Sequence, residues 1–341
     1  MNFKLSRIVS FIILTTMCMQ SYGDIDNDDD NDNDSYGLKV TVDYLLWQAE
    51  TDQLNFALQA PSGTTGENFF AISQAFNKNQ CFKRHSGVRA KVGYEFCDDW
   101  DSALLGTHLT NRSRTSPAQT TGIIATPFNL IFGGAVVVGD GATSIWRSQL
   151  DRVDWEIGYH CNPCDVFDLR LYAGITWGRI QQCQNITFDG TFFGPGAPAD
   201  LSVKKRNCFS GVGPRIGFET AWCLWHDIKL VSNASGALLY GNLRNNTQFI
   251  VVQEEVTVIQ PDFIDCKRRL RPTAQLFLGL DWQPSWQCWE CMQIDLGIGY
   301  EAQYWWNQWQ APASLVPILT GLTQQGDWTT HGLVAHFGIQ F

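Results

Sequence analysis

The 341-residue sequence lacks a long apolar run after its first 19 positions. A helix that crosses a bilayer needs about 20 consecutive apolar residues, and the run at residues 8–19 is shorter. No membrane anchor built of helices is therefore expected. The run follows Lys4 and Arg7 and precedes Ser21-Tyr22-Gly23, which is the order of a secretory signal peptide. We expect residues 1–23 to be removed and the rest of the chain to be exported.

An excess of positive charge is also missing. Lys and Arg number 24 against 34 Asp and Glu, so the formal net charge is −10. This balance argues against nucleic acid as a partner, because binding to DNA or RNA depends on cationic side chains that contact phosphates. Much of the acidity lies in residues 24–36. Such a low-complexity leader cannot bury a core, and we expect it to be disordered.

Motifs that set up a nucleophile or a catalytic metal are missing as well. None of the six histidines lies in a Gly-x-Ser-x-Gly or His-Glu-x-x-His frame. The sequence therefore predicts a protein that is not an enzyme, with no catalytic residues, no cofactor and no metal ion. A hydrolase barrel, with Ser or Asp beside a His at one rim, stays open as an alternative.

A two-residue period dominates the chain from Gly37 onward. Apolar residues occupy alternate positions from Met292 to Tyr304, and polar residues and glycines lie between them. Only strands separate side chains onto two faces in this way. The same alternation predicts ten long strands, at 38–50, 85–97, 99–112, 143–159, 165–181, 208–222, 226–242, 265–282, 290–307 and 329–341.

The connections between these strands alternate between tight turns and long loops, as in bacterial outer-membrane barrels. We therefore predict an all-β fold, a transmembrane antiparallel up-and-down β-barrel over residues 37–341. Its short turns and both ends would face the periplasm. The sequence leaves the number of strands open between 10 and 16, because the loops at 113–141 and 244–262 are apolar enough to add strands or to fold inward. The chain ends on Phe341, which we interpret as the signal for the barrel-assembly machinery.

A soluble β-sandwich would alternate too, but long strands and aromatic strand ends favour a barrel in outer-membrane lipid. The aromatic residues expected at the outer boundary are Trp47, Trp146, Trp177, Tyr240, Trp305, Trp306 and Trp309. Those expected at the inner boundary are Trp100, Tyr159, Trp222, Trp225, Trp282, Trp286 and Trp289.

The polar faces of the strands would line the lumen and set its ion selectivity. The pore-lining candidates are Lys39, Asp43, Arg89, Lys91, Glu95, Asp168, Arg170, Arg215, Glu219, Lys229, Asp295 and Glu301. Further charges on these faces are Arg152, Asp154, Glu156, Asp227 and Asp281. The alternative is that opposite charges pair across strands and fill a narrow barrel, since open porins usually have more strands. The protein would then be a non-porous structural barrel or an adhesin.

Ten cysteines follow the signal peptide, and an exported chain with an even number predicts disulfides. Those near the expected short turns are Cys97, Cys161, Cys164, Cys223, Cys288 and Cys291. Those near the outer loops are Cys81, Cys183, Cys208 and Cys266. A bridge between Cys183 and Cys208 requires Cα atoms within about 7 Å. The two Cys-x-x-Cys pairs also leave zinc binding and redox chemistry open.

Several segments resemble the major outer membrane protein family of Legionella and chlamydia-related bacteria. They are residues 42–50 (VDYLLWQAE), 87–94 (GVRAKVGY) with 99–101 (DWD), 211–217 (GVGPRIG), 237–241 (ALLYG), 270–272 (LRP) and 300–308 (YEAQYWWNQ). The resemblance implies an abundant porin that passes small solutes and stiffens the envelope. The cysteine content is similar to that of the chlamydial members. It implies disulfide cross-links between copies of the chain or to cysteine-rich envelope proteins.

Overall fold

The structure is a computed structural model. It describes residues 37–59, 76–97, 99–116, 124–125, 137–164, 166–192, 198–225, 227–253, 256–259, 263–284, 293–312 and 323–341. The predicted signal peptide and acidic leader lie outside this part of the chain, as do Trp286, Trp289, Cys288 and Cys291.

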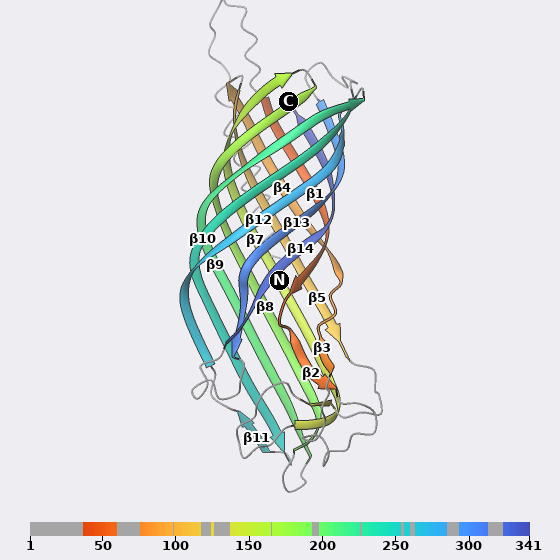
Figure 1. Cartoon of the computed structure of the whole chain (residues 1–341), viewed down its shortest axis with the longest axis vertical. Coiled ribbons are helices and arrows are strands. Elements are labelled where there is room, and N and C mark those ends of the chain that lie inside the picture. The colour runs from red at the N-terminus through yellow and green to blue at the C-terminus, as the bar shows by residue number, and fades with distance from the viewer. Residues whose placement is uncertain are drawn as a thin grey trace, which may run out of the picture. The chain divides into compact units, whose positions relative to one another are not determined.

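Ten long strands form one closed antiparallel barrel (Figure 1). They are β1 (Gly37–Thr51), β4 (Arg84–Cys97), β5 (Trp100–Thr115), β7 (Val137–Cys164), β8 (Phe167–Phe192), β9 (Pro198–Trp225), β10 (Ile228–Gln253), β12 (Phe263–Trp282), β13 (Gln293–Pro312) and β14 (Thr323–Gln340). Each long strand pairs with the next one along the chain, and β14 pairs with β1 to close the ring. The predicted antiparallel barrel is confirmed.

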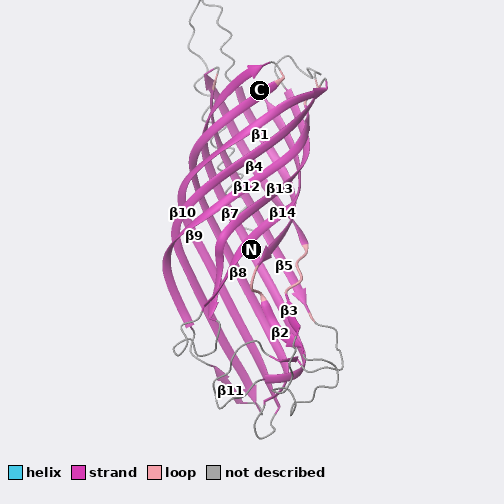
Figure 2. Ribbon diagram, viewed as in Figure 1, coloured by secondary structure: helices cyan, strands magenta, loops and turns pink. Residues whose placement is uncertain are grey.

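Four short strands lie at the end of the barrel that carries the long connections, and they pair with one another or with the terminal segments of β7 and β10. They are β2 (Asn55–Gln59), β3 (Phe76–Asn79), β6 (Ile124–Ala125) and β11 (Val256–Ile259). Strand and turn account for the regular structure of the described chain (Figure 2). Among these residues no helix is both long and apolar enough to cross a membrane.

The two ends of the barrel chain meet at one seam. The backbones of Leu38 and Phe341 hydrogen-bond in both directions, at 3.2 and 3.0 Å. The outward face of the wall is apolar, with Ile216 68% exposed and Tyr44 54% exposed. A band of exposed aliphatic and aromatic side chains is what a wall in contact with lipid requires.

Strands β7 to β10 are much longer than the sequence pattern predicts, at 28, 26, 28 and 26 residues. In the added part of β8, Gln182 and Gln184 face inward and are buried, whereas Cys183 and Asn185 face outward. Farther along, Ile186 and Phe188 are buried inside and Thr187 is exposed outside, so the apolar face of this part of the strand points inward and the outer face is polar. A wall that leaves the lipid no longer needs an apolar outer face.

Five tryptophans are fully buried inside the barrel. They are Trp47, Trp146, Trp305, Trp309 and Trp328. They form one apolar cluster (the tryptophan layer) with residues that include Leu45, Leu150, Phe209 and Leu239. The prediction that Trp47, Trp146, Trp305 and Trp309 belong to the outer aromatic boundary is therefore wrong.

The physical reason for this correction is strand parity. Tyr44 faces outward, so Trp47, three residues later, must face inward. Trp177 and Tyr240 do face outward, at 38% and 54% exposure. The residues expected at the inner boundary that the structure describes are also exposed outward: Trp100, Tyr159, Trp222, Trp225 and Trp282.

Candidate functional site in the barrel lumen

A cavity of about 290 Å³ lies inside the barrel, and residues from all ten long strands line it. All twelve pore-lining candidates are on its wall: Lys39, Asp43, Arg89, Lys91, Glu95, Asp168, Arg170, Arg215, Glu219, Lys229, Asp295 and Glu301. The alternation of the strands brings them together, because each lies on the inward face of its strand. Conduction through this cavity stays a prediction.

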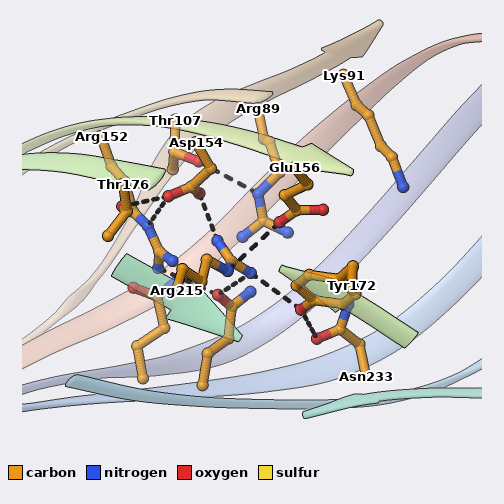
Figure 3. Close-up of polar contacts among 12 residues, drawn as sticks. Arg89, Lys91, Thr107, Arg152, Asp154, Glu156, Tyr172, Thr176, Arg215 and Asn233 are labelled. Carbon is orange, nitrogen blue, oxygen red and sulfur yellow. Dashed lines mark hydrogen bonds and ion pairs between the residues drawn. The ribbon is translucent and has the colours of Figure 1, made fainter. Parts of the chain in front are cut away.

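Two arginines bind carboxylates one strand beyond their neighbours: Arg215 of β9 reaches β7 across β8, and Arg170 of β8 reaches β5 across β7. Arg215 lies 2.6 Å from Asp154 and 3.3 Å from Glu156, as Figure 3 shows. Arg170 holds both oxygens of Asp101 at 2.6 Å. The residues Arg215, Asp154, Glu156 and Arg170 are at most 5% exposed. Buried charges of this kind persist in proteins only when they are paired and hydrogen-bonded.

Other contacts join strands that lie farther apart in the wall. Gln275 of β12 accepts hydrogen bonds from Arg152 of β7 at 3.1 Å and from Arg215 of β9 at 3.2 Å. It also donates to Glu301 of β13 at 2.8 Å. Strands β8, β9 and β10 separate β7 from β12 on the shorter way around the wall. The contact between Gln275 and Arg152 therefore crosses the lumen.

A second crossing joins Lys91 of β4 to Glu219 of β9, with an N–O distance of 3.6 Å. Three strands lie between β4 and β9 on the shorter way. We call the crossed set of charges around Arg89, Arg152, Arg170, Arg215 and their partners the charge network. The prediction that opposite charges pair across strands describes this network, and all of its arginines except Arg152 also line the cavity.

The tryptophan layer lies directly against the charge network. The Arg89 guanidinium carbon is 5.4 Å from the ring centroid of Trp47, and that of Arg152 is 5.9 Å from the ring of Trp305. A guanidinium over an indole face is attracted by the ring quadrupole. The described lumen is therefore a charged cavity on the side of the tight turns, followed by an apolar layer.

Several members of the network were not among the pore-lining candidates. Asp101, His160 and Gln275 line the cavity, and His160 contacts Asp101 at 2.8 Å. Strand parity is the signal for His160, because it shares its face with Asp154 and Glu156. The sequence does not indicate which of these residues contact each other. Asp101 and Arg170, for example, form an ion pair although they are far apart in sequence.

No disulfide joins cysteines within the described part of the chain, so the disulfide prediction finds no support there. Six cysteines are unbonded there: Cys81, Cys161, Cys183, Cys208, Cys223 and Cys266. Cys183 lies opposite Arg206, and Cys208 lies opposite Gln181. The two thiols are therefore two residues out of register, and the predicted bridge does not form. The side chains of Cys97, Cys164, Cys288 and Cys291 lie outside the described residues, which leaves the zinc and redox alternatives untested.

A closed barrel with an apolar outer face and a charged interior defines the class of an outer-membrane β-barrel protein. Comparison with sequence families identifies the chain further. Residues 32–341 match the family described as Legionella pneumophila major outer membrane protein precursor. The chain belongs to this major outer membrane protein family and is a protein of the bacterial outer membrane.

Solved structures with similar chain paths are outer-membrane barrels of low sequence identity. The outer membrane protease OmpT of Escherichia coli is 7% identical over 90% of this chain and 98% of its own, with a TM-score of 0.38. A FadL homologue of Pseudomonas aeruginosa is 8% identical over 91% and 90%, with a TM-score of 0.27. The NalP translocator domain of Neisseria meningitidis is 10% identical over 98% and 97%, with a TM-score of 0.27. No curated protein matches the chain.

Proposed function

We propose that the barrel is a narrow porin-like channel that lets small ions and solutes diffuse passively across the outer membrane. The observation that supports this proposal is the cavity of about 290 Å³ whose wall carries charges from all ten long strands. An aqueous passage needs a polar lining, whereas a barrel filled only for stability is more simply built with apolar residues.

The narrow bore follows from the contacts that cross the lumen. Gln275 with Arg152, and Lys91 with Glu219, bring opposite walls within 3.1 and 3.6 Å. Ten strands also enclose much less space than the 16 to 18 or so of general porins. The channel would therefore exclude large solutes and pass small ions in small current steps.

A charge-selectivity measurement tests this function at Lys229. Lys229 faces the cavity and is half-buried, so its charge acts on passing ions. Lys229→Glu should shift the reversal potential under a salt gradient toward cation selectivity. Lys204→Glu is the control, because Lys204 lies on the outward face of β9, and it should leave the reversal potential unchanged. Equal reversal potentials in wild type and Lys229→Glu would contradict conduction through this cavity.

A second candidate function is a non-porous structural barrel, and the tryptophan layer favours it. Trp47, Trp146 and Trp305 are fully buried in the interior, as in a packed core. This alternative expects a folded protein that carries no current. The hydrolase alternative has no residue assigned to it, and the proposed channel involves no catalysis.

We also propose that exposed cysteines bond to other chains and so stiffen the envelope. Cys81, Cys161, Cys223 and Cys266 are exposed, and they would be accessible to thiols of a second copy or of cysteine-rich envelope proteins. Electrophoresis of intact envelopes tests this proposal. Ladders that collapse to one band on reduction are expected, and a monomer without reductant would contradict it. Recognition of Phe341 by the assembly machinery stays a prediction.

A further inference from the structure

Three potential metal ligands converge on the lumen wall near the end with the tight turns. Asp281 of β12, Asp295 of β13 and His336 of β14 present one ligand atom each, all within 4.8 Å of one another. Asp281 is 8% exposed and Asp295 is 6% exposed. The three side chains come from adjacent strands, so the wall itself fixes their positions.

The distances between these atoms leave room for an ion. Nε2 of His336 lies 3.5 Å from Oδ1 of Asp281 and 3.6 Å from Oδ1 of Asp295. Both separations exceed the usual hydrogen-bond range of about 2.7–3.2 Å. A tetrahedral ion with bonds of about 2.1 Å places its ligands about 3.4 Å apart. The spacing therefore suits a bound ion better than direct hydrogen bonds.

Two buried oxygens at this point accept no hydrogen bond among the described residues. They are Oδ1 of Asp281 and Oδ1 of Asp295, the same two atoms that face His336. A buried carboxylate oxygen that accepts no hydrogen bond is costly. The other oxygen of Asp295 is held by Nζ of Lys39 at 3.0 Å, which orients the carboxylate as outer contacts do in metal sites.

A glycine makes this convergence possible. Gly297 lies opposite both Asp281 and His336 in the sheet. A Cβ at this position would collide with the imidazole of His336 and with Oδ1 of Asp281. Any other residue at 297 would push the two ligands out of place. Asp281, Asp295, His336 and the backbone at Gly297 thus form a preformed pocket on the cavity wall.

We propose that Asp281, Asp295 and His336 bind one divalent transition-metal ion of the zinc class in the barrel lumen. One imidazole with two carboxylates is a donor set that suits zinc and its neighbours, whereas calcium and magnesium prefer oxygen donors alone. Water from the cavity would supply the remaining ligands. The bound ion would link β12, β13 and β14 and add two positive charges to the cavity wall.

Metal titration of the refolded, tag-free barrel in detergent tests this proposal. The thiols are first alkylated with iodoacetamide so that cysteines cannot bind the ion, and the protein is dialysed against EDTA. Calorimetry with Zn²⁺ should then show one equivalent bound. Asp295→Asn and His336→Gln should weaken binding at least tenfold. His331→Gln is the matched control, because His331 lies on the outward face of the same strand, and its affinity should equal that of wild type.

X-ray absorption of the Zn²⁺-loaded wild type provides a second measurement that needs no variant. It should show only nitrogen and oxygen ligands, one of them an imidazole, at about 2.0–2.1 Å. Absence of saturable binding, a zinc shell without imidazole, or equal affinity in His336→Gln and wild type would each overturn the proposal. Gly297→Ala retains all three ligands, and it should weaken binding because its methyl group occupies the space between them.

Discussion

Arg89 of β4 and Glu301 of β13 form a two-point ion pair, with N–O distances of 2.8 and 2.9 Å. Strands β1 and β14 lie between them in the wall, so the pair spans the inside of the barrel. Glu301 is fully buried, and Gln275 and Gln303 also donate to it at 2.8 Å. Side chains inside the lumen thus tie together strands that the backbone does not pair.

The first prediction concerns this pair. Arg89→Met should lower the free energy of unfolding by about 3–5 kcal/mol, because it leaves the Glu301 carboxylate buried without its cation. The double variant Arg89→Met, Glu301→Met should recover much of that loss. Urea titration of the refolded barrel measures both. The control is Lys267→Met, since the pair of Lys267 and Asp265 is more than 40% exposed and should contribute less than about 1 kcal/mol. Equal losses at Arg89 and Lys267 would contradict a buried network.

The second prediction concerns the tryptophan layer. Trp305 is fully buried and lies with its ring centroid 6.1 Å from that of Trp328. Trp305→Ala should cost about 3–5 kcal/mol of stability and increase the current through the channel, because it removes the side chain that packs above Arg152. Trp177→Ala, on the outward face, should leave the current unchanged. A stable Trp305→Ala barrel with wild-type current would show that the layer does not limit conduction.

The ten strands could be predicted because lipid imposes an apolar outer face on each of them. Where β8 and β9 leave the lipid, this rule no longer applies: Gln182 and Asn207 are buried inside, and farther along Ile186 is buried inside as well, so the apolar face is no longer the outer one. The inward position of Trp47 was available from its parity with Tyr44, but the preference of tryptophan for membrane boundaries suggested the opposite. The four arginines of the charge network and most of their carboxylate partners were predicted on the polar faces, but Asp101, His160 and Gln275 were not. Which charges contact each other depends on how the strands tilt and how the barrel closes. The residue pattern of a single strand does not determine either.

The proposed metal pocket could not be predicted from the sequence for the same reason. Asp281 and Asp295 were assigned to the polar faces of their strands, but His336 was given no role, and the three residues are spread over three strands. No short spacing motif connects them, so the sequence led to the expectation of no metal. Only the register between β12, β13 and β14 brings them together at Gly297.

The third prediction tests the lipid-facing wall. Ile216 of β9 is 68% exposed on the apolar outer face. Ile216→Arg should destabilise the barrel by about 2–4 kcal/mol in lipid, because it places a charge in the hydrocarbon region. Thr187→Arg changes an exposed outward position in the long extension of β8, and it should cost less than about 1 kcal/mol. The comparison is made by unfolding in vesicles. A larger loss of stability in Thr187→Arg than in Ile216→Arg would contradict the assignment of the wall around Ile216 to the membrane.

The fourth prediction concerns the orientation of the barrel. Cys266 is exposed beside a long connection, and Cys161 is exposed beside the tight turn between β7 and β8. Two variants are needed, one in which Cys266 is the only cysteine and one in which Cys161 is the only cysteine. A membrane-impermeant maleimide added to intact cells should label the Cys266 variant and not the Cys161 variant. Opening the outer membrane should then expose Cys161. Labelling of Cys161 in intact cells would mean that the tight turns face outward.

Single-channel recording of the wild type in a planar bilayer tests the central claim most directly, under oxidising conditions and again after reduction. The protein must first be shown to be folded by circular dichroism. The narrow, charge-lined lumen predicts discrete current steps that grow with salt concentration. Silence in both conditions from the folded barrel would contradict the channel, and it would identify the filled interior as that of a structural protein.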